Sequence, residues 1–176
     1  MESGNGGGAD PVQLDEPEST VQATSCPDVG LDLRTTDVQP PLEGWLDRQV
    51  ARIARHAGVG SGQLNLVVVN RPFMIELNQR FKGQGDCTDV LTFDLSDQDD
   101  QAASIEADVV ICIEEAVEQA IERGHDIRVE VLLYAVHGLM HLIGLDDRNP
   151  ELAQRMHDRE DELLSEAGFG SVFSSN

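Results

Sequence analysis

The apolar positions of the chain change their spacing several times, and each spacing predicts a type of secondary structure. Short apolar or alternating stretches predict strands at residues 29–38, 64–69, 90–93 and 107–113. Apolar residues at helical spacing predict helices at residues 45–57, 70–82, 114–123 and about 150–164. A fifth predicted helix, 127–143, is apolar on nearly all sides and should therefore be buried. The pattern predicts an α+β domain, with a roughly four-stranded sheet packed by about five helices.

The two ends of the chain differ from this central part. Residues 1–22 are rich in Gly, Asp and Glu and hold almost no large apolar side chains. Such a segment buries too little surface to offset its ordering entropy, so we expect a disordered acidic tail. The predicted domain covers residues 23–168, and residues 169–176 are expected to form a C-terminal tail.

The charge of the chain is strongly negative. Its 176 residues include 33 Asp and Glu against 12 Lys and Arg, which gives a net charge of −21. Residues 1–40 carry 8 acidic residues and 1 basic residue, so the remaining chain still has a net charge of −14. A surface of this sign repels polyanions at a distance and disfavours unspecific binding of nucleic acid. Its simplest role is to keep the protein solvated.

The cysteines and the apolar runs indicate the compartment. Cys26, Cys87 and Cys112 are odd in number and lack C-x-x-C spacing, so we expect reduced thiols. The longest apolar stretch, 131–136, is too short to cross a bilayer, and the first residues do not resemble a signal peptide. We expect a cytoplasmic protein that does not enter a membrane.

The candidate chemistry lies at the end of the buried helix. His137 and His141 are four residues apart, which places both imidazoles on one face of a helix and close enough to share a metal. Gly144 lets the chain reverse, and the turn brings Asp147 back beneath the histidines. Three protein ligands leave the fourth position of a zinc ion to water. The pattern predicts one divalent metal, expected to be zinc, bound by His137, His141 and Asp147.

Each of these residues also has a simpler role. A single histidine on an apolar helix is more often a core residue that is hydrogen-bonded to a carbonyl. Two histidines at this spacing, followed by a glycine turn and two carboxylates, favour a metal. Asp146, the other carboxylate, is expected to be a turn or cap residue.

The same spacing is typical of metzincin zinc proteases, which carry His-x3-His-x2-Gly-x2-His/Asp. Those enzymes need a glutamate directly after the first histidine, as the general base that deprotonates the metal-bound water. Here that position is Gly138, which has no side chain for acid–base work. A zinc protease is therefore the second hypothesis.

Four segments in the right order resemble the bacterial YbeY-type endoribonucleases, which mature ribosomal RNA. Residues 137–147, HGLMHLIGLDD, are similar to the family signature His-Gly-x-x-His-Leu-x-Gly-x-Asp-His. Residues 77–83 (LNQRFKG), 88–93 (TDVLTF) and 107–111 (ADVVI) resemble Leu-Asn-x-x-Tyr/Phe-Arg-Gly, Thr-Asp-Val-Leu-Ser-Phe and Gly-Asp-Ile-x-Ile of that family. Met156 and Glu160 fall where the family's last helix carries Met and Glu. The resemblance covers about residues 28–167 and implies a small α+β domain with the metal at one end of a groove.

Two positions depart from the family pattern. The third ligand is usually histidine in the family and is Asp147 here. Its anionic oxygen weakens the Lewis acidity of a bound zinc and makes a harder metal such as manganese the alternative. Lys82 stands where the family usually carries an active-site arginine, and it meets a phosphate as a point charge rather than as a bidentate partner.

The resemblance implies that Lys82 stabilises the charge that develops on the phosphate in the transition state. The simpler role of Lys82 is that of a solvated residue at a helix end. Arg80 is a weaker candidate for this role, because a residue two positions earlier in a helix points to a different side.

The resemblance implies a metal-dependent endoribonuclease that cuts single-stranded RNA. The implied role is maturation of the 3′ end of small-subunit ribosomal RNA and ribosome quality control, with ribosomal proteins or ribosome-associated factors as partners. A third hypothesis is a non-catalytic ribosome-assembly factor with a structural metal, where Asp146 or His157 supplies a fourth ligand.

Three further features lie near the predicted groove. Asp108 and Glu114 are candidates for groups that support the ligands, and equally for a turn residue and a charge at a helix N-terminus. The acidic loop at residues 94–108 is the least RNA-like part of the chain, and its alternatives are a protein partner or simple solvation.

Overall fold

The structure is a computed structural model that describes residues 30–36 (backbone), 42, 44–96 and 104–173. These residues form four strands and five helices. The strands are β1 (Gly30–Thr36), β2 (Ser61–Val69), β3 (Val90–Asp94) and β4 (Ser104–Cys112). The helices are α1 (Trp45–His56), α2 (Arg71–Lys82), α3 (Ile113–Arg123), α4 (Ile127–Leu142) and α5 (Pro150–Glu166). The predicted α+β class is therefore confirmed. The acidic tail predicted at residues 1–22 lies outside the described residues, as do residues 97–103 of the acidic loop.

The strands form one mixed sheet in the order β1-β2-β4-β3. β1, β2 and β4 are parallel, whereas β3 runs antiparallel to β4 and forms one edge of the sheet. Val90 of β3 pairs with Ile111 of β4, and Asp94 pairs with Ala107. β2 and β4 begin three residues before their predicted starts. Their first residues, most of them polar or glycine, join the sheet because the two strands pair with each other there. Apolar spacing alone does not report such residues.

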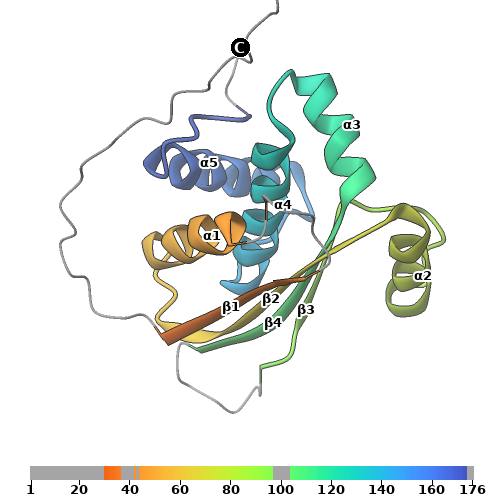
Figure 1. Cartoon of the computed structure of the whole chain (residues 1–176), viewed down its shortest axis with the longest axis horizontal. Helices are drawn as coiled ribbons and strands as arrows, with labels where there is room; N and C mark the ends of the chain where they lie inside the picture. Colours follow the sequence, from red (N-terminus) through yellow and green to blue (C-terminus); the bar gives the residue numbers. More distant parts are fainter. Residues whose placement is uncertain (1–29, 37–41, 43, 97–103, 174–176) are drawn as a thin grey trace, which may run out of the picture.

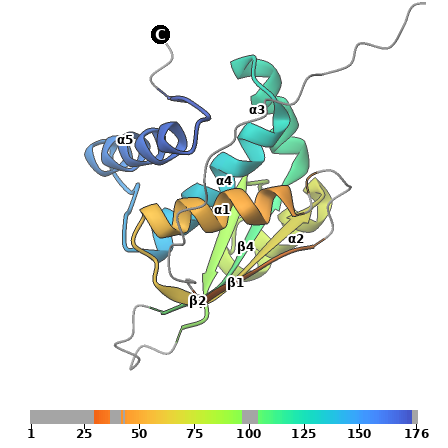
Figure 2. The same ribbon diagram turned by 60° about the vertical axis from the view of Figure 1, so that its left-hand side comes forward.

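The helices cover the two faces of the sheet unequally. α1, α4 and α5 lie over one face, and α2 alone lies against the other (Figures 1 and 2). The main core lies between the sheet and α1, α4 and α5. α4 contributes a continuous buried run, Val131–Val136, to this core. A smaller cluster under α2 contains Met74, Leu91 and Val110. None of the helices in the described ranges combines the length and the apolar character needed to span a membrane.

α4 lies close to the sheet at Gly138. A Cβ atom at this position would be 2.8 Å from Val109 Cγ1 and 2.9 Å from Thr92 Oγ1, which is closer than packed atoms tolerate. The glycine therefore lets the helix approach β3 and β4 without a side chain between them. Because His137 lies directly before Gly138, this close contact also places the histidine beside the edge strand.

Capping residues determine where the helices beside the candidate site begin. Asn70 accepts a hydrogen bond from the backbone N–H of Phe73 at 3.0 Å, so it caps α2 as predicted, with Pro72 in the first turn. Asp126 caps α4 in the same way, and Asn149 caps α5. These caps define where the helices that carry the candidate site residues begin.

The first residues of the predicted C-terminal tail, 169–173, belong to the folded domain. The Phe169 ring packs edge-on against Trp45, with 5.7 Å between ring centroids. The buried carboxylate of Asp161 accepts hydrogen bonds from Val172 N at 2.7 Å and Phe173 N at 3.0 Å. A buried carboxylate needs such donors, so it holds the segment that supplies them. These contacts hold residues 169–173, which the sequence predicted as part of a tail, against α1 and α5.

Candidate metal centre

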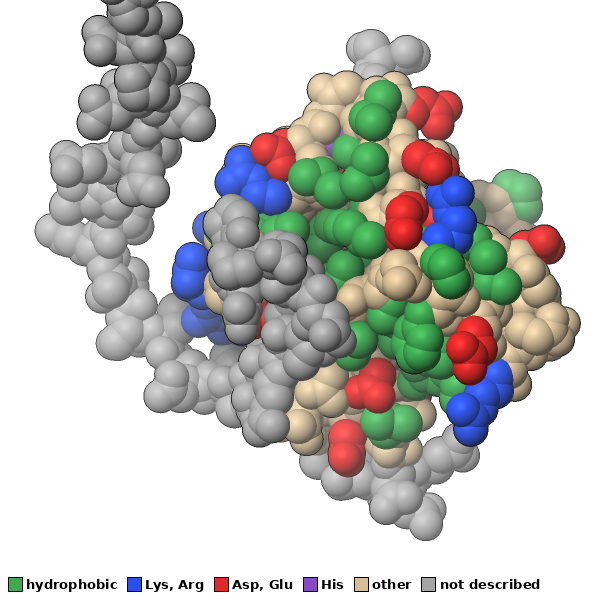
Figure 3. All heavy atoms as spheres, turned by 45° about the vertical axis from the view of Figure 1, so that its right-hand side comes forward, with side chains coloured by type: hydrophobic (Ala, Val, Ile, Leu, Met, Phe, Trp, Pro, Cys, Tyr) green, Lys and Arg blue, Asp and Glu red, His purple; other side chains and the backbone are tan. Residues whose placement is uncertain are grey.

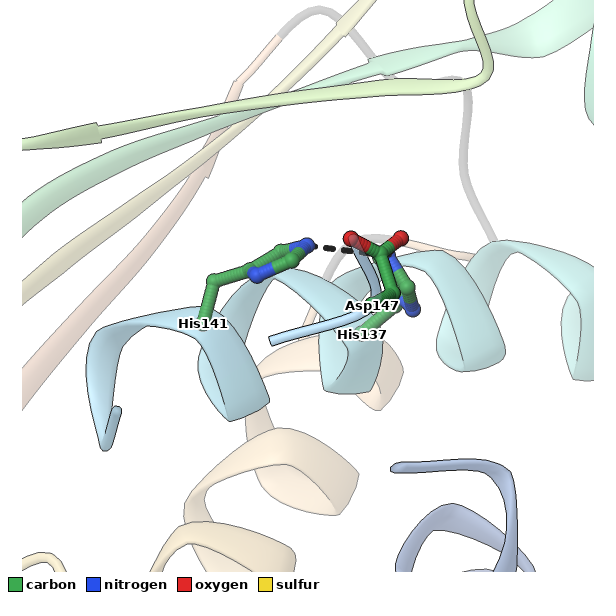
Figure 4. A group of neighbouring side chains, drawn as sticks. All are labelled: His137, His141 and Asp147. Carbon is green, nitrogen blue, oxygen red and sulfur yellow. Dashed lines mark hydrogen bonds and ion pairs between the residues drawn. The ribbon is translucent and has the colours of Figure 1, made fainter. Parts of the chain in front are cut away.

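The side chains of His137, His141 and Asp147 converge on one point beside α4 (Figure 4). The Nε2 atoms of the two histidines are 3.1 Å apart, and His137 Nε2 is 3.7 Å from Asp147 Oδ2. One ligand atom from each residue lies within 4.8 Å of the others. The structure thus brings together all three residues that were predicted to bind the metal.

The turn after α4 explains how a carboxylate six residues after His141 reaches both rings. α4 ends at Leu142, and Gly144 adopts a φ of 90°, which side chains other than glycine rarely tolerate. Leu145 N then donates to Met140 O at 2.9 Å and closes the turn. Asp146 accepts from Arg148 N at 3.1 Å and forms an ion pair with the same arginine, which confirms its expected turn role.

The rings of both histidines are oriented by groups behind them. His137 Nδ1 donates to the Glu160 carboxylate at 2.8 Å, and His141 Nδ1 donates to the backbone carbonyl of Leu145 at 3.2 Å. Because a carboxylate and a carbonyl can only accept, the proton of each ring lies on Nδ1. In the neutral form of each ring the lone pair is therefore on Nε2, and the two Nε2 atoms face the same point, 3.1 Å apart. This arrangement is typical of histidines that bind a metal.

Glu160 is the site residue that sequence spacing did not assign. It lies on α5, 23 residues after His137, and is completely buried. Burial lowers the pKa of His137, but the hydrogen bond and the charge of Glu160, with smaller contributions from Asp89 and Asp147, outweigh burial and raise the pKa overall. The resemblance had matched Glu160 to a family glutamate, but it did not indicate what this side chain contacts.

The three candidate ligands open into a pocket of about 380 Å³ at the free edge of β3. Lys82, at the end of α2, lines the same pocket, whereas Arg80 does not. The other lining residues are Thr88, Asp89, Val90, Thr92, Asp94 and Leu142. Three carboxylates (Asp89, Asp94 and Asp147) face one ammonium, which gives a formal charge of −2 if the histidines are neutral. This charge attracts a divalent cation and would repel a phosphate in its absence.

Asp108 and Glu114 lie away from the ligands. The Asp108 carboxylate accepts a hydrogen bond from Asn65 Nδ2 at 2.8 Å, on the sheet face opposite α4. Glu114 accepts from the backbone N–H of Arg71 at 2.9 Å. Neither residue lines the pocket, so their alternative roles as structural polar groups agree with the structure.

A fourth protein ligand is missing among the residues that the structure describes. His157 stacks on the Phe173 ring, with 4.0 Å between ring centroids, and Asp146 is held by Arg148. The trio of His137, His141 and Asp147 is the only group of this kind found in those ranges. Three nitrogen and oxygen ligands next to an open pocket fit a zinc or manganese ion with an exchangeable position, as in catalytic sites.

Two cysteines of the small cluster under α2 lie close together without forming a disulfide. Cys87 and Cys112 are free thiols with their sulfur atoms 3.6 Å apart, as predicted, and Cys26 lies outside the described residues. Burial, followed by the hydrogen bond and charge of Cys112, raises the pKa of Cys87 to about 12. A thiol with this pKa is almost fully protonated at neutral pH, so Cys87 is a poor nucleophile.

Comparison with known proteins places this geometry in one family. The family model described as Endoribonuclease YbeY matches residues 31–168. A protein named Endoribonuclease YbeY from Carboxydothermus hydrogenoformans is 36% identical over 133 residues, which cover 76% of this chain and 91% of the relative. One of the same name from Pelotomaculum thermopropionicum is 33% identical and covers 72% and 87% of the two chains. The solution structure of TM1509 from Thermotoga maritima matches with a TM-score of 0.53 at 25% identity, and covers 83% of this chain and 97% of that chain.

Proposed function

Because the chain belongs to the YbeY endoribonuclease family, we propose that it cuts single-stranded RNA with a divalent metal held by His137, His141 and Asp147. The observation that carries this proposal is the open three-ligand trio in a pocket that also holds Lys82. Both Nε2 atoms are presented by hydrogen bonds behind the rings, so the site needs little rearrangement to bind an ion.

The proposed metal is zinc, with manganese as the alternative that the Asp147 oxygen favours. A bound divalent ion supplies a Lewis acid for the phosphate and lowers the pKa of a coordinated water. The residues of the chain supply the rest. Glu160 holds the His137 ring in place, and the lining carboxylates Asp89 and Asp94 are the candidate proton acceptors of the pocket.

Lys82 is the proposed catalytic residue. Its ammonium lines the pocket, and no carboxylate of the described residues lies within ion-pair distance of it. Because no ion pair holds it, the ammonium is free to meet the phosphate and to stabilise the negative charge that grows in the transition state. Lys82 therefore takes the position of the usual family arginine.

The proposed physiological substrate is ribosomal RNA, at the 3′ end of the small-subunit molecule. Ribosomal proteins or ribosome-associated factors would bring the acidic chain to that substrate, and the proposed place of action is the cytoplasm. We also propose one endoribonuclease domain from residue 23, extended from 168 to 173 by the packing of the last residues. The family match over residues 31–168 lies within these limits.

The protease hypothesis is disfavoured by the packing of α4. A metzincin glutamate would have to occupy the Gly138 position, where even a Cβ atom meets Val109 and Thr92. A side chain there would point at the strands β3 and β4, where these two residues leave it no room. The hypothesis of a structural metal is disfavoured by the three-ligand, open arrangement.

Metal removal and substrate choice test the proposal together. The full chain is treated with a chelator, then reloaded with Zn²⁺ or Mn²⁺, and assayed on single-stranded RNA and on casein. We expect the metal-free protein to leave RNA intact and the reloaded protein to cleave it, while casein stays intact throughout. Casein digestion would support the protease, and a metal-loaded protein that cuts neither substrate would support the structural metal.

Replacing Lys82 with alanine is expected to lower kcat/KM for RNA cleavage by about a hundredfold, the usual effect of losing one group that stabilises transition-state charge. Lys82→Arg should retain most of the activity, since the charge is kept. Arg55→Ala is the matched control, because it removes the same unit charge from an exposed position of α1 that does not line the pocket. Equal losses in Lys82→Ala and Arg55→Ala would mean that only net charge matters.

A further inference from the structure

Two aromatic rings lie beside the free edge of β3, and the proposed chemistry does not use them. The Phe81 ring, on the last turn of α2, is 56% exposed. It meets the Phe93 ring edge-on, with 4.9 Å between centroids. The guanidinium carbon of Arg80 lies 5.4 Å from the centre of the Phe81 ring. A single exposed ring is common at a protein surface, but a pair of rings next to a cation and a candidate catalytic pocket offers a flat apolar face to a ligand.

The aromatic pair borders the candidate metal site through its chain neighbours. Phe81 directly precedes Lys82, which lines the pocket. Phe93 lies between Thr92 and Asp94, which also line the pocket. Successive side chains of a strand point to opposite faces, so Phe93 lies on the α2 face and its two neighbours lie on the face toward α4. A chain that bends around the edge of β3 passes from the pocket to the aromatic pair.

Phe81 is flanked by two basic side chains, although the protein as a whole is acidic. Arg80 and Lys82 flank Phe81, and neither forms an ion pair with any described carboxylate, although the chain has a net charge of −21. Arg71, at the other end of α2, is by contrast paired with Glu115 and Glu118. Figure 3 brings the α2 side of the molecule forward and shows apolar side chains with both acidic and basic side chains among them. The last turn of α2 thus offers one ring and two free cations.

We propose that Phe81, supported by Phe93 and flanked by Arg80 and Lys82, is a stacking platform for a base of single-stranded RNA next to the phosphate that is cut. The proposal rests on the proposed function and adds a subsite to it. Every base has a flat face that stacks on an aromatic ring, and adjacent cations hold the phosphates of the same strand. Stacking of this kind tolerates any sequence but requires an unpaired base. The platform would therefore select single strands over duplexes.

The test compares two exposed phenylalanines of the same helix. Phe81→Leu removes the aromatic face and keeps an apolar side chain, and Phe81→Trp keeps a stacking surface. Phe73→Leu is the control, because Phe73 is also exposed (47%) on α2 but lies eight residues earlier. On a single-stranded RNA whose cut site is mapped with the wild-type protein, we expect Phe81→Leu to lower kcat/KM about tenfold, chiefly through KM. Phe81→Trp and Phe73→Leu should stay within about twofold of wild type.

An abasic nucleotide separates base stacking from other roles of Phe81. Abasic residues are placed one at a time beside the mapped cut site, and one of them should slow wild-type cleavage about tenfold. On that substrate Phe81→Leu should cause no further loss, because the base that it contacted is already absent. Equal tenfold losses on intact and abasic RNA would overturn the platform and favour a protein contact or a structural role for Phe81.

The outcomes separate this inference from the proposed function. If Phe81→Leu cleaves RNA as fast as the wild type does, the platform is overturned and the proposed nuclease function still stands. No RNA cleavage by the metal-loaded wild type overturns the proposed function itself. A binding measurement makes the same distinction without cleavage. We expect the wild type to quench the fluorescence of 2-aminopurine in single-stranded RNA, and Phe81→Leu to lose this quenching, even where no bond is cut. Quenching that is equal in both proteins contradicts the platform.

Discussion

Replacing His141 with alanine is expected to remove the bound metal and RNA cleavage together. His141 Nε2 lies 3.1 Å from His137 Nε2, so this ring supplies one of the three candidate ligand atoms among the described residues. Two remaining ligands, one of them a carboxylate with 44% of its side chain exposed, do not hold zinc at micromolar concentration. We expect less than about 0.1 metal per chain by mass spectrometry and a loss of at least about a thousandfold in cleavage rate.

His157→Ala is the matched control for that variant. His157 stacks on Phe173 and takes no part in the metal trio, so the control should keep its metal and its activity. Circular dichroism and the melting temperature of both variants show whether either has unfolded. Full metal content in a folded His141→Ala variant would contradict the ligand assignment, whatever its activity.

Replacing Gly138 with glutamate is expected to prevent folding rather than to create a protease. The change restores the His-Glu-x-x-His sequence of metalloproteases, but the new side chain would project at Val109 and Thr92. A buried carboxylate without partners and an overfilled contact each cost several kcal/mol, so we expect the free energy of unfolding to fall by more than about 4 kcal/mol. Urea denaturation followed by circular dichroism measures this loss.

Val117→Glu controls for the added charge. Val117 lies on the exposed side of α3 and is 38% exposed, so its replacement should change stability by less than about 1 kcal/mol. Gly138→Ala tests the clash alone: alanine favours helix by about 1 kcal/mol over glycine, yet a net loss of stability is expected here. A folded Gly138→Glu protein that digests casein would contradict the packing argument and revive the protease.

The elements that were predicted correctly are those with a strong local pattern. The cap at Asn70 and the all-round apolar run of α4 each depend on residues close in sequence. The same is true of the candidate ligands, which lie within one helix and the turn after it. Short-range periodicity and glycine turns determine such features, and the chain shows them directly.

The features that were missed depend on contacts between distant segments. Glu160 reaches His137 from another helix, and the pairing of β3 with β4 places Thr92 and Asp94 in the pocket. Nothing in the spacing of residues reports such a contact. Asp108 is an instructive exception, because it alternates with the buried Ala107 and Val109 and therefore had to face away from α4. Strand alternation would have removed it from the candidates.

The short span of the candidate ligands affects the thermodynamics of folding. His137, His141 and Asp147 lie within eleven consecutive residues, so an unfolded chain keeps them almost as close together as the folded one. A ligand that binds both states stabilises the native state only by the difference between its two affinities. The buried hydrogen bond from Glu160 and the rigid end of α4 supply much of that difference. Metal should therefore protect this protein against denaturation less than it protects one whose ligands come from distant strands. The same property allows the chain to capture its metal early, before the sheet has formed.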